Sequence, residues 1–416
     1  MNHRATRYNL GPLANKNYRL LLSGFALGQL LMPLQFLTQI LWVQNSAPQN
    51  IWLILVALVA ASRGIGAVTF GLYGGALADR FDRRKLLILT QALLVIITLA
   101  IAGLMHADID GVLGFVLFFA LALLGAGLQA IDMPTRLAIV PDVLGPELTP
   151  AGMSLNQVAG QLAMPVAMIG TGFFIDEFGY GGAYLLSVIG HLLTIVFLGL
   201  MSYHSEPRPQ QPRYGFRDAL TDVREGFTYA RGHHVVLWVI ILLVTMMGLG
   251  YPATASLGPT WITTVVGVEI RDLGFVVMTW GVGSLIAAIA LTRFSAVERR
   301  GRLIGIGALL FALSFIVFVG HDSVLNAVIG NLGLGAGMTI TTVSSTILIQ
   351  QLVPNEVRGR IMSIFQLNMG FAQLMTMPVA ILAQWLTLAV LFPVLAVITT
   401  LAVSLILVTR RALWHA

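Results

Sequence analysis

Long apolar runs separated by short polar stretches occupy almost the whole chain. A helix that crosses a bilayer needs about 20 mostly apolar residues. Runs of this kind cover residues 18–43, 51–77, 86–105, 111–138, 151–175, 183–203, 234–256, 273–292, 303–319, 324–350, 361–384 and 388–409. The runs are continuous and lack the ten-residue alternation of a β-barrel strand, which favours helices. The pattern predicts an all-α membrane protein with twelve transmembrane helices.

The basic residues predict how these helices are oriented. With the N-terminus in the cytoplasm, every one of the 24 lysines and arginines except Arg63 and Arg271 falls on the same side of the twelve-span layout. Cytoplasmic loops carry such an excess of positive charge. We therefore expect a multi-pass protein of the cell inner membrane with both termini in the cytoplasm. The first run, from Tyr18, is long enough to be a retained helix and not a cleaved signal.

Composition supports a membrane protein and narrows the chemistry. Of the 416 residues 57% are hydrophobic and only 10% charged, whereas about a quarter are charged in a soluble domain. The net charge of +6 does not indicate a nucleic-acid partner, because the basic residues lie between apolar runs and form no continuous face. There is no cysteine, hence no disulfide or thiolate metal site. No metal or cofactor is expected, and without a Gly-Lys-Ser/Thr loop we expect no ATP drive.

Short segments of the first half of the chain recur in the second half. Residues 140–142 recur as 353–355, residues 153–157 as 362–366, and residues 164–167 as 377–380. The order is kept and both copies enter a span from the same side, which predicts two pseudo-symmetric six-helix bundles related by an axis along the membrane normal. We expect an N-terminal bundle over 1–203, a cytoplasmic linker over 204–232 and a C-terminal bundle over 233–416. In the linker, Phe216, Leu220, Val223 and Phe227 share one face of a predicted amphipathic helix.

One loop resembles the signature of a known family. Residues 75–85 read GALADRFDRRK between the second and third predicted spans. This resembles the Gly-x-Leu-Ala-Asp-Arg-x-Gly-Arg-Arg loop of the major facilitator superfamily, with Asp82 where the general motif has glycine. That change is similar to the branch that contains enterobactin exporters and macrolide efflux proteins. In the family this loop is a cytoplasmic latch between the halves, a role that the resemblance gives to Gly75, Asp79, Arg80, Arg83 and Arg84.

The resemblance also implies a function. It implies a monomeric secondary transporter, not an enzyme, that exports a drug-like compound or siderophore by alternating access and is coupled to protons. One alternative is the same fold moving a lysolipid or another amphiphile, and another is a facilitator without ion coupling. An intramembrane enzyme would need clustered acidic or histidine residues at reactive depth. One aspartate and one distant histidine within the spans do not supply such a cluster.

Ionisable residues within predicted spans are candidates for coupling or for substrate contact, because charge in hydrocarbon is costly. Asp132 is expected either to exchange a proton or to pair with Arg136 four residues later, and we favour the pair. Arg63 is expected to hold an anionic substrate, a lipid headgroup or Asp132, or else to stabilise helix packing. His191 is interpreted as a hydrogen-bonded packing residue in preference to a proton relay.

Amide side chains within the spans form a second group of candidates for the cavity. The group comprises Gln29, Gln35, Gln39, Gln157, Gln161, Gln366 and Gln373, with methionines interleaved in the spans at 151–175 and 361–384. Such residues could line an adaptable cavity or join helices by hydrogen bonds. We favour the cavity for the first span and helix-to-helix contact for the other two.

Overall fold

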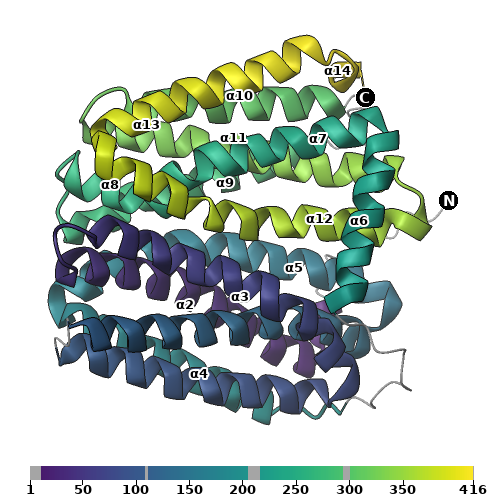
Figure 1. Cartoon of the computed structure of the whole chain (residues 1–416). Coiled ribbons are helices and arrows are strands. Elements are labelled where there is room, and N and C mark those ends of the chain that lie inside the picture. Colours follow the sequence, from purple (N-terminus) through teal and green to yellow (C-terminus); the bar gives the residue numbers. More distant parts are fainter. Residues whose placement is uncertain (1–10, 108–110, 205–215, 294–299, 416) are drawn as a thin grey trace.

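The computed structural model describes residues 11–107, 111–204, 216–293 and 300–415, and over these ranges the chain is helical with no β-strand (Figure 1). Within helices, it leaves undescribed the side chains of residues 71–76, 78–80, 216–220, 222, 223, 293, 355, 356, 358–360, 362, 363, 365, 366 and 415. The elements are α1 (Gly11–Ala14), α2 (Lys16–Ser46), α3 (Trp52–Arg80), α4 (Arg83–His106), α5 (Val112–Gly199), α6 (Phe216–Gly232), α7 (His234–Thr245), the π-helical turns η1 (Met246–Gly250) and η2 (Pro252–Ser256), α8 (Gly258–Thr264), α9 (Ile270–Arg293), α10 (Arg300–Val319), α11 (Val324–Leu352), α12 (Asn355–Leu374), α13 (Thr376–Thr409) and α14 (Ala412–His415).

Nine helical stretches in the described chain are long and apolar enough to cross a membrane. The longest has 88 residues, or about 130 Å at 1.5 Å per residue, which exceeds a bilayer core about fourfold. It is broken at Gly145 and Gly179, whose φ angles of 72° and 67° lie in the left-handed region open to glycine. Thr387 breaks α13 in the same way. All three breaks fall where the sequence pattern places loops, although the number twelve itself stays a prediction.

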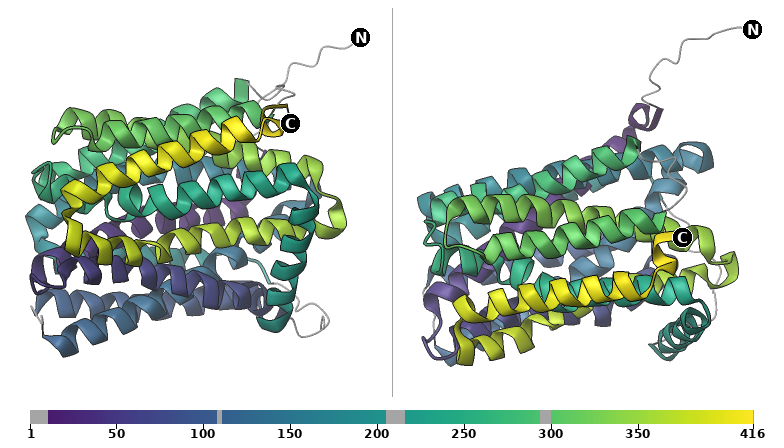
Figure 2. Two further views of the ribbon diagram at one scale, coloured as in Figure 1. Left: turned by 45° about the horizontal axis from the view of Figure 1, so that its top comes forward. Right: turned by 90° about the horizontal axis from the view of Figure 1, so that it is seen from above.

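The helices of the two parts of the chain gather in separate groups. Figure 1 shows α2 to α5 in one group and α7 to α13 in the other, with α6 running across one end of both. The further views in Figure 2 show the same arrangement. The helix predicted in the linker is therefore present, over Phe216–Gly232. The boundaries assigned to the two bundles stay a prediction.

The outer surface of the helices is apolar. On α13, Leu401, Leu405 and Val408 are 64%, 64% and 70% exposed, while Val403 and Leu407 on the opposite face are buried. Residues spaced by four and three share one face of a helix. An exposed apolar stripe of this length suits contact with lipid and not with water, in agreement with a membrane-spanning protein.

The two ends of the bundle differ in charge. Helices α4 and α10 begin, and α13 ends, at the end of the bundle that α6 crosses. The basic residues at this end include Arg83, Arg84, Arg300, Arg302 and Arg411. We call this the basic end. The opposite end, which we call the outer end, carries the connection between α2 and α3 and the short helix α8.

The two groups of helices touch closely at the outer end. A Cβ atom added to Gly274 of α9 would lie 2.2 Å from the Met168 carbonyl oxygen of α5, so only glycine fits there. The Gln44 amide donates to Thr263 Oγ1 at 3.0 Å, and the Gln384 amide donates to the Asn50 carbonyl at 2.9 Å. These contacts close the outer end and leave the cavity described below on the inner side of the contact.

Candidate functional site

A central cavity of about 160 Å³ lies between the two groups of helices. One wall comes from α2, α3 and α5, and the other from η2, α8, α9, α11 and α12, together with Tyr251 between the π-helical turns. Its lining residues are Met32, Pro33, Phe36, Leu37, Arg63, Met164, Met168, Tyr251, Thr254, Ala255, Gly258, Pro259, Ile262, Val277, Trp280, Asn331, Met369 and Gln373. A site between two bundles is the position from which a rocking motion could expose it to either side.

The cavity wall is mostly apolar and adaptable. Four methionines line it, together with the rings of Phe36, Tyr251 and Trp280. Methionine side chains repack easily and make favourable contacts with aromatic rings. The π-helical turns η1 and η2 flank Tyr251, and such turns are frequent at functional sites. This wall suits a ligand with a flat or branched apolar body.

Among the described residues, Arg63 of α3 is the one charged residue that lines the central cavity. Its guanidinium carbon lies 4.6 Å from the centre of the Phe36 ring, and Nη2 donates a long hydrogen bond of 3.4 Å to the Met32 carbonyl. In the part of the chain that the structure describes, no acidic side chain lines this cavity or the pocket beside it. The guanidinium therefore faces the cavity with an aromatic ring and a carbonyl as its described partners.

Arg63 also lines a small polar pocket within the first group of helices. This pocket has a volume of about 20 Å³, which is room for about one water molecule. Its polar lining comprises Gln35, Gln39, Thr98, Gln129 and Tyr184. The Gln39 amide donates to the Tyr184 hydroxyl at 2.7 Å, and the Gln129 amide donates to Gln35 Oε1 at 3.2 Å. Arg63 thus lines both the central cavity and this hydrogen-bonded polar pocket.

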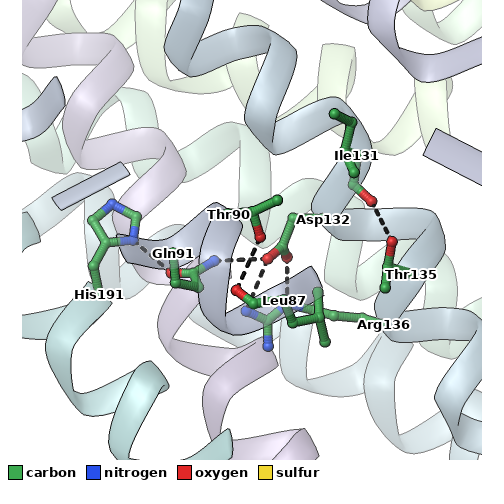
Figure 3. A network of polar contacts seen from close by, with 8 residues as sticks. All are labelled: Leu87, Thr90, Gln91, Ile131, Asp132, Thr135, Arg136 and His191. Atoms are coloured by element: carbon green, nitrogen blue, oxygen red, sulfur yellow. Dashed lines mark hydrogen bonds and ion pairs between the residues drawn. The ribbon is translucent and has the colours of Figure 1, made fainter. Parts of the chain in front are cut away.

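A buried polar network continues from this pocket toward the basic end (Figure 3). His191 Nε2 lies 3.3 Å from the Gln35 amide nitrogen, and His191 Nδ1 lies 2.7 Å from Gln91 Oε1. The Gln91 amide donates to Asp132 Oδ2 at 2.7 Å. Asp132 in turn pairs with Arg136, whose Nε donates to Oδ1.

The network shows the contacts of two candidate residues, Asp132 and His191. Asp132 pairs with Arg136, as favoured from their spacing, so Arg63 does not take Asp132 as its partner. His191 is buried and hydrogen-bonded on both ring nitrogens, which agrees with its interpretation as a packing residue. Because Asp132 is only 9% exposed, the pair is screened from solvent within the bundle.

The latch loop is only partly described. Gly75, Asp79 and Arg80 belong to α3, but their side chains lie outside the described residues. Arg83 Nη1 contacts Asp142 Oδ2 at 2.6 Å, and Arg84 donates to the carbonyls of Leu198 and Gly199 at 2.6 and 2.5 Å. These contacts of Arg83 and Arg84 join α4 to α5 within the first group, so the latch between the groups stays a prediction.

Asp82, the residue that departs from the family motif, has a clear local role. It precedes α4 as the N-cap residue, and its Oδ1 accepts the backbone N–H of Lys85 at 3.0 Å. An aspartate at this position satisfies a helix N–H that would otherwise lack a partner, and its charge favours the positive end of the helix dipole.

The predicted amide candidates fall in different places. Gln373 lines the central cavity, while Gln35 and Gln39 line the small polar pocket. Gln29 packs against Gly160, and Gln157 is exposed. Gln29, Gln157 and Gln161 line neither the central cavity nor the polar pocket. The side chain of Gln366 lies outside the described residues.

Several residues of the site were not anticipated. Tyr251, Trp280 and Asn331 line the central cavity, and Gln91 and Gln129 belong to the polar network. Gln91 and Gln129 carry a signal that could have found them, because an amide within an apolar run is a sign of a buried contact. Gly250-Tyr251-Pro252 likewise interrupts an apolar helix and could have marked the cavity wall.

Over the ranges described, no group of three or more histidine, aspartate and glutamate side chains lies close enough together to hold a metal ion. Asp132 and His191 are joined through Gln91 and do not share a ligand position.

Comparisons with known proteins agree with this architecture. The sequence model of the Major Facilitator Superfamily matches residues 20–377. The chain is 19% identical over 355 residues to the staphyloferrin A transporter of Staphylococcus aureus. The matched region covers 85% of this chain and 86% of that protein. It is 24% identical over 306 residues to the enterobactin exporter EntS of Shigella boydii serotype 18, over 71% and 69% of the two chains.

Solved transporter structures share the fold at low sequence identity. The nucleoside transporter NupG superposes with a TM-score of 0.73 and 12% identity, over 96% of this chain and 98% of that chain. The D-xylose-proton symporter superposes with a TM-score of 0.68 and 16% identity, over 94% and 95% of the two chains.

Proposed function

The chain belongs to the major facilitator superfamily, and from this premise we propose that it is a secondary active transporter that exports a small amphipathic molecule. The observation that carries the proposal is the central cavity between the two groups of helices, whose described lining is an apolar wall with a single arginine. Two relatives of low identity are a staphyloferrin A transporter and an enterobactin exporter, which supports a siderophore as cargo. A drug-like compound suits the same wall.

In this proposal Arg63 holds an acidic group of the cargo. An arginine keeps its charge in proteins, so within a membrane-spanning helix it needs a partner. The Met32 carbonyl at 3.4 Å and the Phe36 ring offer only weak compensation, and no acidic residue with a described side chain lines the cavity. A carboxylate or phenolate on the cargo would accept hydrogen bonds from the guanidinium, while the methionines and Trp280 enclose its apolar body.

Alternating access is proposed to work through the outer contact. With Gln44 bonded to Thr263 and α5 packed on Gly274 of α9, the outer end is closed. Rocking of the two groups would separate these contacts and open the cavity to the outside. On the predicted orientation, this releases cargo away from the cytoplasm.

Proton coupling is proposed for the network at Asp132. Protonation of this carboxylate would remove its charge and so weaken its pairing with Arg136, and Gln91 and His191 connect the change to the small pocket beside Arg63. Facilitated transport without ion coupling is the alternative, and a transport assay with and without a pH gradient separates the two.

A second candidate is a transporter of lysolipids or similar amphiphiles. The same combination of Arg63 and an apolar wall would accept a lipid phosphate and part of its acyl chain. The cargo thus differs between the two candidates, but the site and the residue that binds the anionic group are shared.

The test is a thermal-shift screen followed by transport in proteoliposomes. Purified protein is heated with a catecholate siderophore, a hydroxycarboxylate siderophore, a macrolide and a lysophospholipid, because a ligand stabilises the state that it binds. Arg63→Gln should abolish the shift from the anionic compound that binds, and Arg63→Lys should keep part of it. Arg19→Gln at the exposed basic end is the matched control. Shifts that are equal in the wild type and Arg63→Gln would contradict the assignment of Arg63.

A further inference from the structure

A groove of about 530 Å³ lies on the exposed side of the second group of helices, close to the basic end of the bundle. It is formed where α10, α13 and α14 meet (Figure 1). Its lining residues are Leu309, Ser404, Leu407, Val408, Arg411 and Trp414. None of these residues lines the central cavity, so the groove is separate from the proposed transport site.

The indole ring of Trp414 forms one end of the groove and is held by a hydrogen bond. Trp414 Nε1 donates to the Leu407 carbonyl at 3.0 Å, which satisfies the ring nitrogen. The ring lies against Gly305 of α10, where an added Cβ would be 3.0 Å from Cη2. Tryptophan held in this way is typical of the membrane interface, where an apolar ring and a polar nitrogen meet headgroups.

Two arginines lie at the same end of the groove. Arg411 lines it and is exposed. Arg302 is also exposed and shares one face of α10 with Gly305 and Leu309, at spacings of three and four residues. Because Gly305 contacts Trp414 and Leu309 lines the groove, Arg302 lies toward its basic end. Arg410 is directed elsewhere, with its guanidinium 4.1 Å from the Trp238 ring.

The remainder of the groove is apolar and continues into the lipid-facing stripe of α13. Val408 is 70% exposed, and Leu405 and Leu401 follow it along the same helix face. Over the described ranges, no acidic residue lines the groove. The site thus combines an apolar channel at the depth of acyl chains with two positive charges at its interfacial end.

We propose that this groove binds one anionic phospholipid, with an acyl chain along Leu309, Ser404 and Val408 and the phosphate between Arg302 and Arg411. Basic pockets between transmembrane helices on the cytoplasmic side are suited to anionic headgroups. A zwitterionic lipid would fill the channel but would bring its own positive charge toward the two arginines. The charge complementarity therefore selects an anionic lipid.

Retention of lipid by the purified full-length protein tests the proposal. The protein is equilibrated with equal amounts of phosphatidylglycerol and phosphatidylcholine in detergent micelles, and bound lipid is counted by native mass spectrometry. Wild-type protein should retain one phosphatidylglycerol at concentrations at which phosphatidylcholine is not retained. Arg302→Gln/Arg411→Gln should weaken this retention about 30-fold, since each basic residue near the headgroups contributes about fivefold.

Two further variants separate the groove from general surface charge. Lys16→Gln/Arg19→Gln removes the same charge from the basic end of the first group and should leave retention unchanged. Ser404→Phe keeps both arginines but fills the channel, and it should reduce retention at least tenfold. Equal retention of the two lipids, or an equal loss in the control double variant, would overturn the proposal and indicate unselective surface lipid. Unchanged retention of phosphatidylglycerol by Ser404→Phe would likewise contradict binding of the acyl chain in the channel.

Discussion

The buried pair of Asp132 and Arg136 gives the sharpest prediction for stability. Replacing Arg136 by methionine keeps much of the side-chain volume but leaves Asp132, which is 9% exposed, without its cationic partner. Breaking a buried ion pair from one side typically costs about 3–5 kcal/mol, because a charge remains buried and uncompensated. Arg136→Met should therefore lower the free energy of unfolding by about that amount.

The double variant Asp132→Asn/Arg136→Met is the decisive comparison. The amide that replaces the carboxylate can still accept a hydrogen bond from Gln91 and carries no charge, so no uncompensated charge remains. We expect the double variant to recover at least about 2 kcal/mol relative to Arg136→Met. Unfolding of the purified protein in mixed micelles, followed by circular dichroism, measures both values. A double variant that is no more stable than Arg136→Met would refute the reasoning that the lone carboxylate is the cause.

Three further variants test other contacts of the fold. His191→Leu removes one hydrogen-bond partner from each of Gln91 and Gln35 and should lower the free energy of unfolding by about 1–3 kcal/mol, with a smaller loss for His191→Gln. Arg84→Gln loses two charge-assisted contacts to carbonyls at the end of α5 and should cost about 1–2 kcal/mol, and a cost below about 0.3 kcal/mol would contradict the capping role. Gly274→Val should force α9 away from Met168 and raise the reactivity of a cysteine introduced at Gln44 toward a membrane-impermeant maleimide, whereas unchanged reactivity would contradict a closed outer contact.

The helices and their order could be predicted from the sequence because a bilayer imposes long apolar runs. Gly145, Gly179 and Thr387 break the chain inside predicted loops, where polar residues and glycine interrupt the apolar pattern. The pairing of Asp132 with Arg136 was also predictable, since residues four apart on a helix are neighbours. In each case the information is local in sequence.

The central cavity could be predicted only in part, because it depends on which helix faces meet. Arg63 was recognised as costly within a span, but its possible partners included Asp132 until the packing showed that carboxylate beside Arg136. Trp280 lines the cavity from α9, and its sequence surroundings resemble those of an ordinary lipid-facing aromatic, whereas Tyr251 was marked only by its neighbours Gly250 and Pro252. Regular spacing is also insufficient to predict the lining: Gln161 repeats regularly with Met164 and Met168, yet of these three only the methionines line the cavity.

The central claim is that the two groups of helices separate at the outer end during each transport cycle. Since the chain has no cysteine, Gln44→Cys/Thr263→Cys creates one unique pair of thiols across the contact that now measures 3.0 Å between the two side chains. A short bis-thiosulfonate reagent should link this pair and stop transport of the identified cargo in proteoliposomes, and a reducing agent should restore it, with the two single-cysteine variants unaffected. Cross-linked protein that transports at the rate of the unlinked protein would contradict the account.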